Sequence, residues 1–287
     1  MAAAALCAGL AASPALAQEA DAKATFDTAM QAAVDGPQDI ALASQGTLHL
    51  PAGKRFIPQP QAAQMLRAMG NPGDYSDLQG LVFPQEKSGW FAVLRFEKAG
   101  YIKDDDAKDW NADELLKSYR EGTEEGNKER EKMGVAPIEI VGWAEKPAYD
   151  AANRRLVWAM SLRDKGSTNE AEQSVNYNTY ALGREGYFSL DLVTGLKELP
   201  AQKGEAQTLL GALAFDKGKQ YGDFNASTDH VAEYGLAALV LGVGAKKLGL
   251  LALGFAFIAK FAKLAILAVV GFGAAITKIF KRNKPAE

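Results

Sequence analysis

The fold is decided by residues 137–193, which read PIEIVGWAEKPAYDAANRRLVWAMSLRDKGSTNEAEQSVNYNTYALGREGYFSLDLV. Four segments of this stretch are rich in β-branched and aromatic residues, which favour strands: 137–144, 155–163, 173–182 and 186–193. The pieces between them are short and rich in turn-forming residues: Lys146-Pro147, 164–169 and 183–186. Short connections join antiparallel neighbours, because a parallel pair needs a crossover of about a dozen residues. We therefore predict an antiparallel meander.

Further elements are expected on both sides of this meander. Asn111, followed three residues later by Glu114, has the form of a capping box, so a long helix is predicted from Ala112 to about Met133. Its residues past Tyr119 are nearly all polar, which indicates that most of the helix faces water. The other predicted elements are helices at 23–34, 60–69 and 203–213, and strands around the 51–53 turn, at 80–84 and at 89–96. The fold class is therefore α+β, an antiparallel sheet with flanking helices.

The C-terminal end, Gly235–Phe280, contains no Asp or Glu. Its charged residues are all lysines: Lys246, Lys247, Lys260, Lys263 and Lys278. A membrane-spanning helix needs about 20 mostly apolar residues, and the lysines divide this end into three shorter runs. Some of the lysines must then lie near helix ends and extend to the lipid headgroups. We predict a transmembrane helix or helical hairpin in a lipid bilayer, with two alternatives: a basic helix on the membrane surface, or an apolar hairpin in a globular core.

The first residues, MAAAALCAGLAASPALAQ, are typical of a secretory signal peptide. An apolar run is followed by Ala15-Leu16-Ala17, the small-x-small pattern of a signal peptidase site, so the mature chain is expected to begin at Gln18. No basic residue precedes the run, which indicates a start site further upstream; an Ala-rich helix is the alternative. Cleavage removes Cys7, the chain's single cysteine, and with it any disulfide, thiol nucleophile or cysteine-ligated metal.

Composition and charge divide the chain into parts. The predicted parts are a signal peptide (1–17), an N-terminal helical or linker segment (18–45), a soluble α+β domain (46–214), a linker (215–229), the membrane anchor (230–280) and a basic tail (281–287). The net charge of −3 divides into −10 for residues 1–234 and +7 for residues 235–287. An acidic domain is a poor partner for nucleic acid, so no nucleic-acid function is expected. The positive-inside rule leaves both a single span and a hairpin open.

Several stretches are similar to one protein family: LPAGKRFIP (50–58), GLVFP (80–84), GYIKDDDAKDWNADELL (100–116), NKER (127–130), IVGWAEKPAYD (140–150), RLVWAM (155–160) and VNYNTYALGREGY (175–187). By these stretches and the apolar end that follows, residues 40–280 resemble the bacterial membrane-anchored family called domain of unknown function 2167. The resemblance implies a protein of the bacterial inner (cytoplasmic) membrane whose soluble domain is exported to the periplasm. It implies no activity, so no catalytic residue is carried over.

The best candidates for a metal site are Asp104, Asp106 and Asp109, in the acidic loop before the long helix. A calcium loop of the EF-hand type that begins at Asp104 needs Gly at its sixth position and Glu at its twelfth, and the chain meets neither requirement. Negative charge near a helix N-terminus explains the loop better, so no metal or cofactor is predicted. His49 and His230 are too few and too far apart in sequence for a triad or a histidine zinc site.

No catalytic set stands out in this sequence, which favours a non-enzymatic binding or sensing module with a protein partner in the envelope. Arg184, at a predicted hairpin turn, is expected either to pair with a nearby acid or to mark a binding face. Two alternative functions stay open. One is a cell-envelope hydrolase that uses carboxylate or metal chemistry. The other is a channel or transport accessory built from the C-terminal helices, in which the chain would form a homo-oligomer through its anchor.

Overall fold

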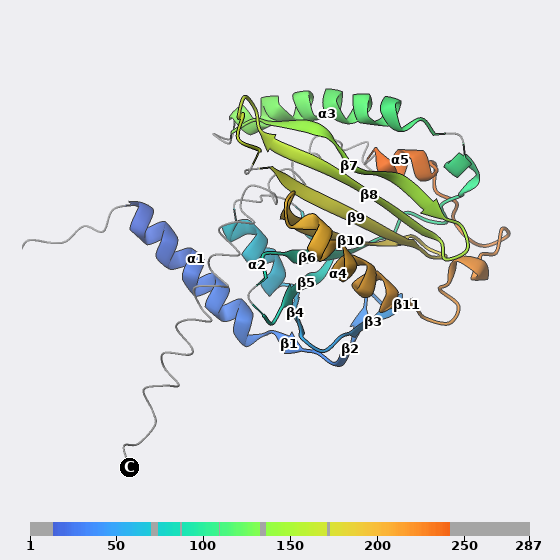
Figure 1. The fold of residues 1–287 in the computed structure, drawn as a ribbon. Coiled ribbons are helices and arrows are strands. Elements are labelled where there is room, and N and C mark those ends of the chain that lie inside the picture. Colours follow the sequence, from blue (N-terminus) through green and yellow to red (C-terminus); the bar gives the residue numbers. More distant parts are fainter. Residues whose placement is uncertain are drawn as a thin grey trace, which may run out of the picture.

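A computed structural model describes residues 14–69, 74–86, 88–108, 110–132, 136–170 and 173–241 of the 287-residue chain (Figure 1). Within these residues the main sheet has eight strands, each antiparallel to its neighbours. In spatial order they are β1 (Val34–Asp35), β4 (Lys54–Pro58), β5 (Leu78–Pro84), β6 (Phe91–Glu97), β10 (Tyr187–Gly195), β9 (Ser174–Leu182), β8 (Arg155–Asp164) and β7 (Ile138–Asp150). An antiparallel sheet with flanking helices is therefore confirmed.

The strands of residues 137–193 form the predicted meander, since β7, β8, β9 and β10 are successive neighbours in the sheet. One predicted turn is wrong, because β7 continues through Lys146-Pro147 and the chain turns at 151–154 instead. Proline is tolerated at this position because β7 is the outermost strand, where a missing N–H removes no ladder bond. The register between β7 and β8 shifts at three places between Ile140 and Ala148, which marks bulges around the proline.

One face of the main sheet packs on helix α4 (Leu199–Gly211) and on a small second sheet. This second sheet has the order β11 (Leu213–Phe215), β3 (Gly46–Leu50) and β2 (Gln38–Leu42). Helix α4 crosses β9 and β10 (Figure 1). The core between these layers is built around the fully buried side chains of Trp90, Tyr177 and Phe188.

The segment 18–45, predicted to be a helix or a linker, supplies strands as well. Helix α1 (Pro14–Gln31) accounts for its first part, and β1 and β2 follow. Strand β1 forms because it pairs with β4, which lies beyond both β2 and β3 in the chain, whereas β2 and β3 form a hairpin through the turn at residues 43–45. The two strands predicted around the 51–53 turn are confirmed as β3 and β4, which belong to different sheets.

The opposite face of the main sheet carries two further cores. One lies between β4, β5, β6 and helices α1 and α2 (Gln61–Ala68), and includes Ile57, Leu81 and Phe91. The other lies between β7, β8, β9, the long helix α3 (Ala112–Lys132) and the short helix α5 (Leu236–Val240). Two 3-10 turns, η1 (Asp105–Lys108) and η3 (Tyr221–Asp223), border this second core. Helices therefore cover both faces of the sheet (Figure 1).

Helix α3 begins at the predicted residue, Ala112. The side-chain oxygen of Asn111 accepts the backbone N–H of Asp113 at 2.9 Å and of Glu114 at 3.3 Å, which caps the helix. The prediction that most of its polar part faces water is confirmed, since Arg120, Glu121, Glu124, Glu125 and Lys128 are exposed, but the side that covers β7 is buried. There Asn127 is 3 % exposed and Arg130 is 1 % exposed.

Among the described residues, no helix is both long and apolar enough to cross a membrane. Residues 1–13 of the predicted signal peptide and residues 242–287, with most of the predicted anchor, lie outside the described part of the chain. Anchor and signal peptide therefore stay predictions. Within the range assigned to the anchor, α5 belongs to the folded domain, since Leu236, Leu239 and Val240 are each 1 % exposed or less in its core.

Candidate functional site

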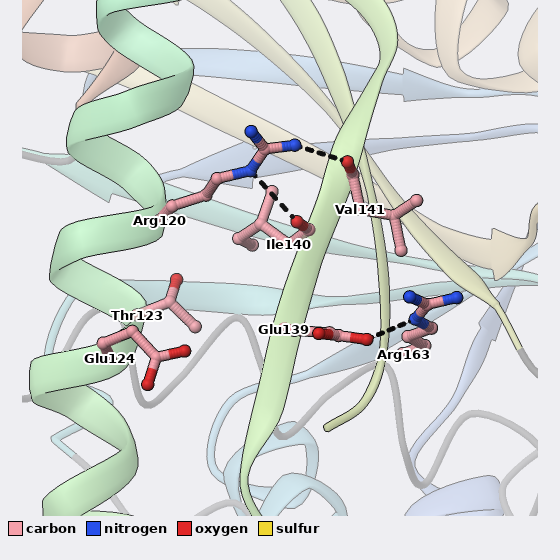
Figure 2. Close-up of a pocket in the computed structure, with 7 residues that line it drawn as sticks. All are labelled: Arg120, Thr123, Glu124, Glu139, Ile140, Val141 and Arg163. Carbon is pink, nitrogen blue, oxygen red and sulfur yellow. Dashed lines mark hydrogen bonds and ion pairs between the residues drawn. The ribbon is translucent and has the colours of Figure 1, made fainter. Parts of the chain in front are cut away.

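A pocket of about 410 Å³ opens between α3 and β7 (Figure 2). Its volume falls within the range of ordinary ligand pockets, roughly 300–1,000 Å³. The pocket is lined by Arg120, Thr123, Glu124, Glu139, Ile140, Val141 and Arg163. Because four of these seven residues are charged, the pocket suits a polar ligand.

The pocket is held open by polar contacts between α3 and the outer edge of β7. An edge strand presents unpaired backbone groups, and the helix satisfies several of them. Arg120 Nη2 donates to the carbonyl of Val141 at 2.7 Å, and its Nε donates to that of Ile140 at 3.3 Å. Asn127 Nδ2 donates to the carbonyl of Ile138 at 2.8 Å, and its Oδ1 accepts the N–H of Ile138 at 2.9 Å. These contacts fix the helix at a set distance from the strand.

The two carboxylates of the pocket occur in ion pairs. Glu139 pairs with Arg163 across β7 and β8 (Figure 2), and Glu124 Oε2 lies 2.6 Å from Lys165 Nζ. Each of these carboxylates therefore has a cation beside it, and the pocket presents paired charges to a polar ligand.

Asp104, the first of the three predicted metal candidates, forms a cluster with two tyrosines and an arginine. Its Oδ2 accepts the Tyr149 hydroxyl at 2.8 Å and pairs with Arg154, and its Oδ1 lies 3.2 Å from the Tyr221 hydroxyl. Burial opposes ionisation, but the Tyr149 hydrogen bond and the Arg154 charge hold the pKa of Asp104 below its ordinary value. Arg154 also lies over the Tyr221 ring, 4.8 Å from its centroid.

Asp106, the second candidate, caps another helix. Its two carboxylate oxygens accept the backbone N–H groups of Leu236 at 3.0 Å and Ala237 at 3.1 Å, at the start of α5. Asp109 lies outside the described residues. In the described part of the chain, no group of three or more His, Cys, Asp or Glu could hold a metal ion. Asp104 and Asp106 thus both bind residues 221–237, the C-terminal segment of the domain.

Arg184 pairs with an acid, which was one of its two predicted roles. Its Nε and Nη2 bind the two oxygens of Asp229 at 2.7 and 2.8 Å, and its Nη1 donates to the carbonyl of Gly218 at 3.2 Å. The guanidinium holds the pKa of Asp229 well below its ordinary value. His49 contacts Asp39 at 2.7 Å on the exposed side of the second sheet, away from this cluster.

A buried carboxylate that sequence reasoning missed is Asp191 on β10. It is 1 % exposed, and neither of its oxygens has a hydrogen-bond partner among the described residues. Burial raises the pKa of Asp191 to about 7, against the opposing effect of the Arg95 charge. The nearby Ser189 hydroxyl also favours the charged form of Asp191, although it is not placed to donate a hydrogen bond to either carboxylate oxygen. The signal in the sequence is the alternation of polar and apolar residues along β10.

Comparison with known proteins identifies a family. The family model described as "Protein of unknown function (DUF2167)" matches residues 34–273. The chain belongs to this family. The predicted resemblance is therefore confirmed, and the family description states no activity.

The chain was also compared with curated proteins and with solved structures. No curated protein matches the chain. The chain is similar to a solved structure titled "Solution Structure of Cyanobacterial PsbP (CyanoP) from Synechocystis sp. PCC 6803". The identity is 9 % and the TM-score 0.37, over 62 % of this chain and 92 % of that one.

Proposed function

We propose that the chain is a non-enzymatic binding or sensing module of the bacterial envelope, exported and tethered to the inner membrane. The observation that carries the proposal is the way α5 is built into the domain. Leu236 and Leu239 lie in the core, and Asp106 caps the helix. The apolar sequence that we expect to enter the bilayer continues directly from α5. Membrane attachment of that sequence would hold the folded domain close to the bilayer.

The pocket between α3 and β7 supports binding as the domain's role. Its carboxylates are neutralised in ion pairs, and its frame is fixed by hydrogen bonds to the backbone of β7. A site of fixed shape with paired charges offers specificity for a polar ligand at low ordering cost. We therefore assign this pocket as the binding face of the module.

The test of export and tethering uses the single cysteine of the chain. In a Cys7→Ser background, one cysteine is placed at Lys217, exposed in the domain, or at Asn283, in the tail. Spheroplasts are treated with a membrane-impermeant maleimide before and after lysis. We expect Lys217→Cys to be labelled without lysis and to stay with the membrane fraction after a high-salt wash.

The tail cysteine then separates the membrane topologies. Labelling of Asn283→Cys only after lysis indicates a single span, and labelling in intact spheroplasts indicates a hairpin. Protection of Lys217→Cys in intact spheroplasts would contradict export. Release of the chain by the salt wash would contradict insertion. A photo-crosslinker on Thr123→Cys, compared with Lys217→Cys, tests the pocket; equal adducts at both positions would count against it.

A further inference from the structure

The lining of the pocket between α3 and β7 includes a positive charge without a counter-ion. Each of its two carboxylates has a cation of its own. The remaining charged residue of the lining is Arg120, whose Nε and Nη2 donate to two neutral backbone carbonyls of β7. Within the described part of the chain, Arg120 forms no ion pair with a carboxylate. Its charge is therefore left to attract a negatively charged ligand.

Arg163, on the other side of β7, keeps hydrogen-bond donors for such a ligand. Its Nε is used in the pair with Glu139, and Figure 2 shows that Nε, not the terminal nitrogens, faces this carboxylate. No described residue accepts a hydrogen bond from Nη1 or Nη2. The side chain is 29 % exposed, so a ligand in the pocket can reach it. Two parallel N–H groups of one guanidinium match the two oxygens of a carboxylate.

A backbone N–H of β7 adds a third donor. Ile138 directs both its N–H and its C=O at Asn127 on α3, and Ile140 directs its C=O at Arg120. The N–H and C=O of one strand residue point to the same side of the strand, so the N–H of Ile140 also points off the sheet edge toward α3. Ile140 lines the pocket and is 7 % exposed. The described side chains of α3 supply no acceptor for this N–H, and a buried N–H needs one.

The charges of the lining favour a ligand with one negative charge over a ligand with two. Arg120 balances a single charge, whereas a second charge would stand in the same pocket as Glu124 and Glu139. Like charges at close range repel. A carboxylate carries one charge, and a phosphate group carries between one and two at neutral pH. The pocket is therefore better suited to a carboxylate than to a phosphate.

We propose that this pocket binds the carboxylate of an acylated amino acid, the group found at the C-terminus of a peptide. The carboxylate accepts N–H groups from Nη1 and Nη2 of Arg163, and Arg120 supplies the balancing charge. The N–H of Ile140 donates to the acyl carbonyl oxygen, in the way that edge strands bind peptide backbones. The inference rests on the proposed function, because it names the ligand class of the pocket assigned there.

The experiment titrates the full chain, labelled with ¹⁵N-arginine and ¹⁵N-isoleucine, with N-acetylglycine and with the uncharged N-acetylglycinamide. N-acetylglycine should shift the Nε–H signal of Arg163 and the backbone signal of Ile140, and both shifts should saturate together. N-acetylglycinamide lacks the carboxylate and should leave the Arg163 signal unchanged. Acetate lacks the acyl group and should bind more weakly without shifting Ile140; affinity equal to that of N-acetylglycine would assign a free carboxylic acid instead. Inorganic phosphate should bind more weakly than N-acetylglycine.

A charge-preserving variant tests the role of the guanidinium. Arg163→Lys keeps a cation beside Glu139 but loses the two parallel N–H groups, so it should weaken N-acetylglycine binding by about tenfold. Arg67→Lys, the same change at an exposed arginine of α2, is the matched control and should leave the affinity unchanged.

Three results would overturn the proposal: no saturable shift with N-acetylglycine, an equal response to N-acetylglycinamide, or phosphate binding at least as tight. The wild-type titration gives each of them, so the test does not depend on how well a variant folds. A chain that captures a partner through the crosslinker on Thr123→Cys but does not respond to N-acetylglycine would contradict the carboxylate ligand alone. The binding role of the pocket would then stand.

Discussion

At the scale of single residues, Asp191 should dominate the pH dependence of stability. Its pKa is about 7 in the folded chain and roughly 3.9 in an unfolded one. Between these values the folded state holds a proton that the unfolded state has lost, so the free energy of unfolding falls as pH rises. Below the unfolded pKa, Asp191 is protonated in both states and does not affect the free energy of unfolding. Above the folded pKa, it is charged in both states and destabilises the folded state by the full amount. The gap between the folded and unfolded pKa values corresponds to about 4 kcal/mol.

The prediction is that Asp191→Asn removes this dependence. The variant should gain stability over the wild type progressively between about pH 4 and pH 7, and hold that gain above it. Urea denaturation of both chains across this range, in a buffer free of amines, measures the difference. Asp105→Asn, at an exposed aspartate, serves as the control and should follow the wild type. If the free energy of unfolding varied with pH in the same way for wild type and Asp191→Asn, the folded-state pKa of Asp191 would not be raised.

The residue scale also shows what a sequence pattern leaves out. Alternation along β10 is the usual sign of a strand with one wet face, yet Ser189 and Asp191 are both buried, because helices cover both faces of the sheet. The acidic loop was predicted to supply negative charge at a helix N-terminus, and Asp106 does so. That helix is α5, 130 positions away in sequence, and no local pattern connects the two.

At the scale of elements, local patterns predicted most strands and helices. The meander β7–β10, the helices α2 and α4 and the start of α3 were all expected from alternation, breakers and caps. The short strands β1, β2 and β11 were missed. Pairing with distant strands determines β1 and β11 rather than their own composition. Strand β2 pairs with its neighbour β3 through a turn whose left-handed residues are Ala43 and Ser44, so the usual glycine signal is missing. The turn predicted at Lys146-Pro147 was wrong because only the position of β7 at the sheet edge makes proline acceptable there.

The polar side of α3 leads to a prediction at this scale. Asn127 pairs with both backbone groups of Ile138 and is 3 % exposed. Asn127→Ala leaves a buried N–H and a buried C=O unsatisfied, so it should lower the free energy of unfolding by about 1–3 kcal/mol. Glu121→Ala, on the exposed side of the same helix, should change it by less than about 0.5 kcal/mol. Urea denaturation compares the two variants, and equal effects would show that α3 does not protect the edge of β7.

At the scale of the whole molecule, residues 216–241 form hydrogen bonds and ion pairs with residues much earlier in the chain. The N–H of Tyr101 donates to the carbonyl of His230 at 2.8 Å, and the N–H of Ala232 donates to the carbonyl of Tyr101 at 2.9 Å. Asp104 contacts Tyr221, and Arg184 holds Asp229. The sequence suggested a polar linker at 215–229, because hydropathy reports composition and not long-range contacts. In the structure, residues of this segment are held to the domain by the contacts of Tyr221 and Asp229.

This closure predicts where the chain can be shortened. A chain that ends at Leu241 keeps Leu236, Leu239 and Val240 in the core and should unfold cooperatively. A chain that ends at Phe215 loses these side chains and Tyr221. Burial of each large apolar side chain is worth about 1.5–3 kcal/mol, so the combined loss is comparable with the whole stability of a domain, about 5–15 kcal/mol. The shorter chain should therefore fail to show a thermal unfolding transition by circular dichroism.

A point variant keeps this prediction testable if the shorter chain cannot be purified. Leu239→Ala in the full chain leaves a cavity in the core under α5 and should cost about 2–5 kcal/mol. Ala214→Gly, at an exposed position of β11, changes no buried side chain and serves as the reference. If Leu239→Ala and the chain ending at Phe215 both unfold at the wild-type temperature, residues 216–241 are a detachable linker. The domain would then not be rigidly joined to whatever follows α5.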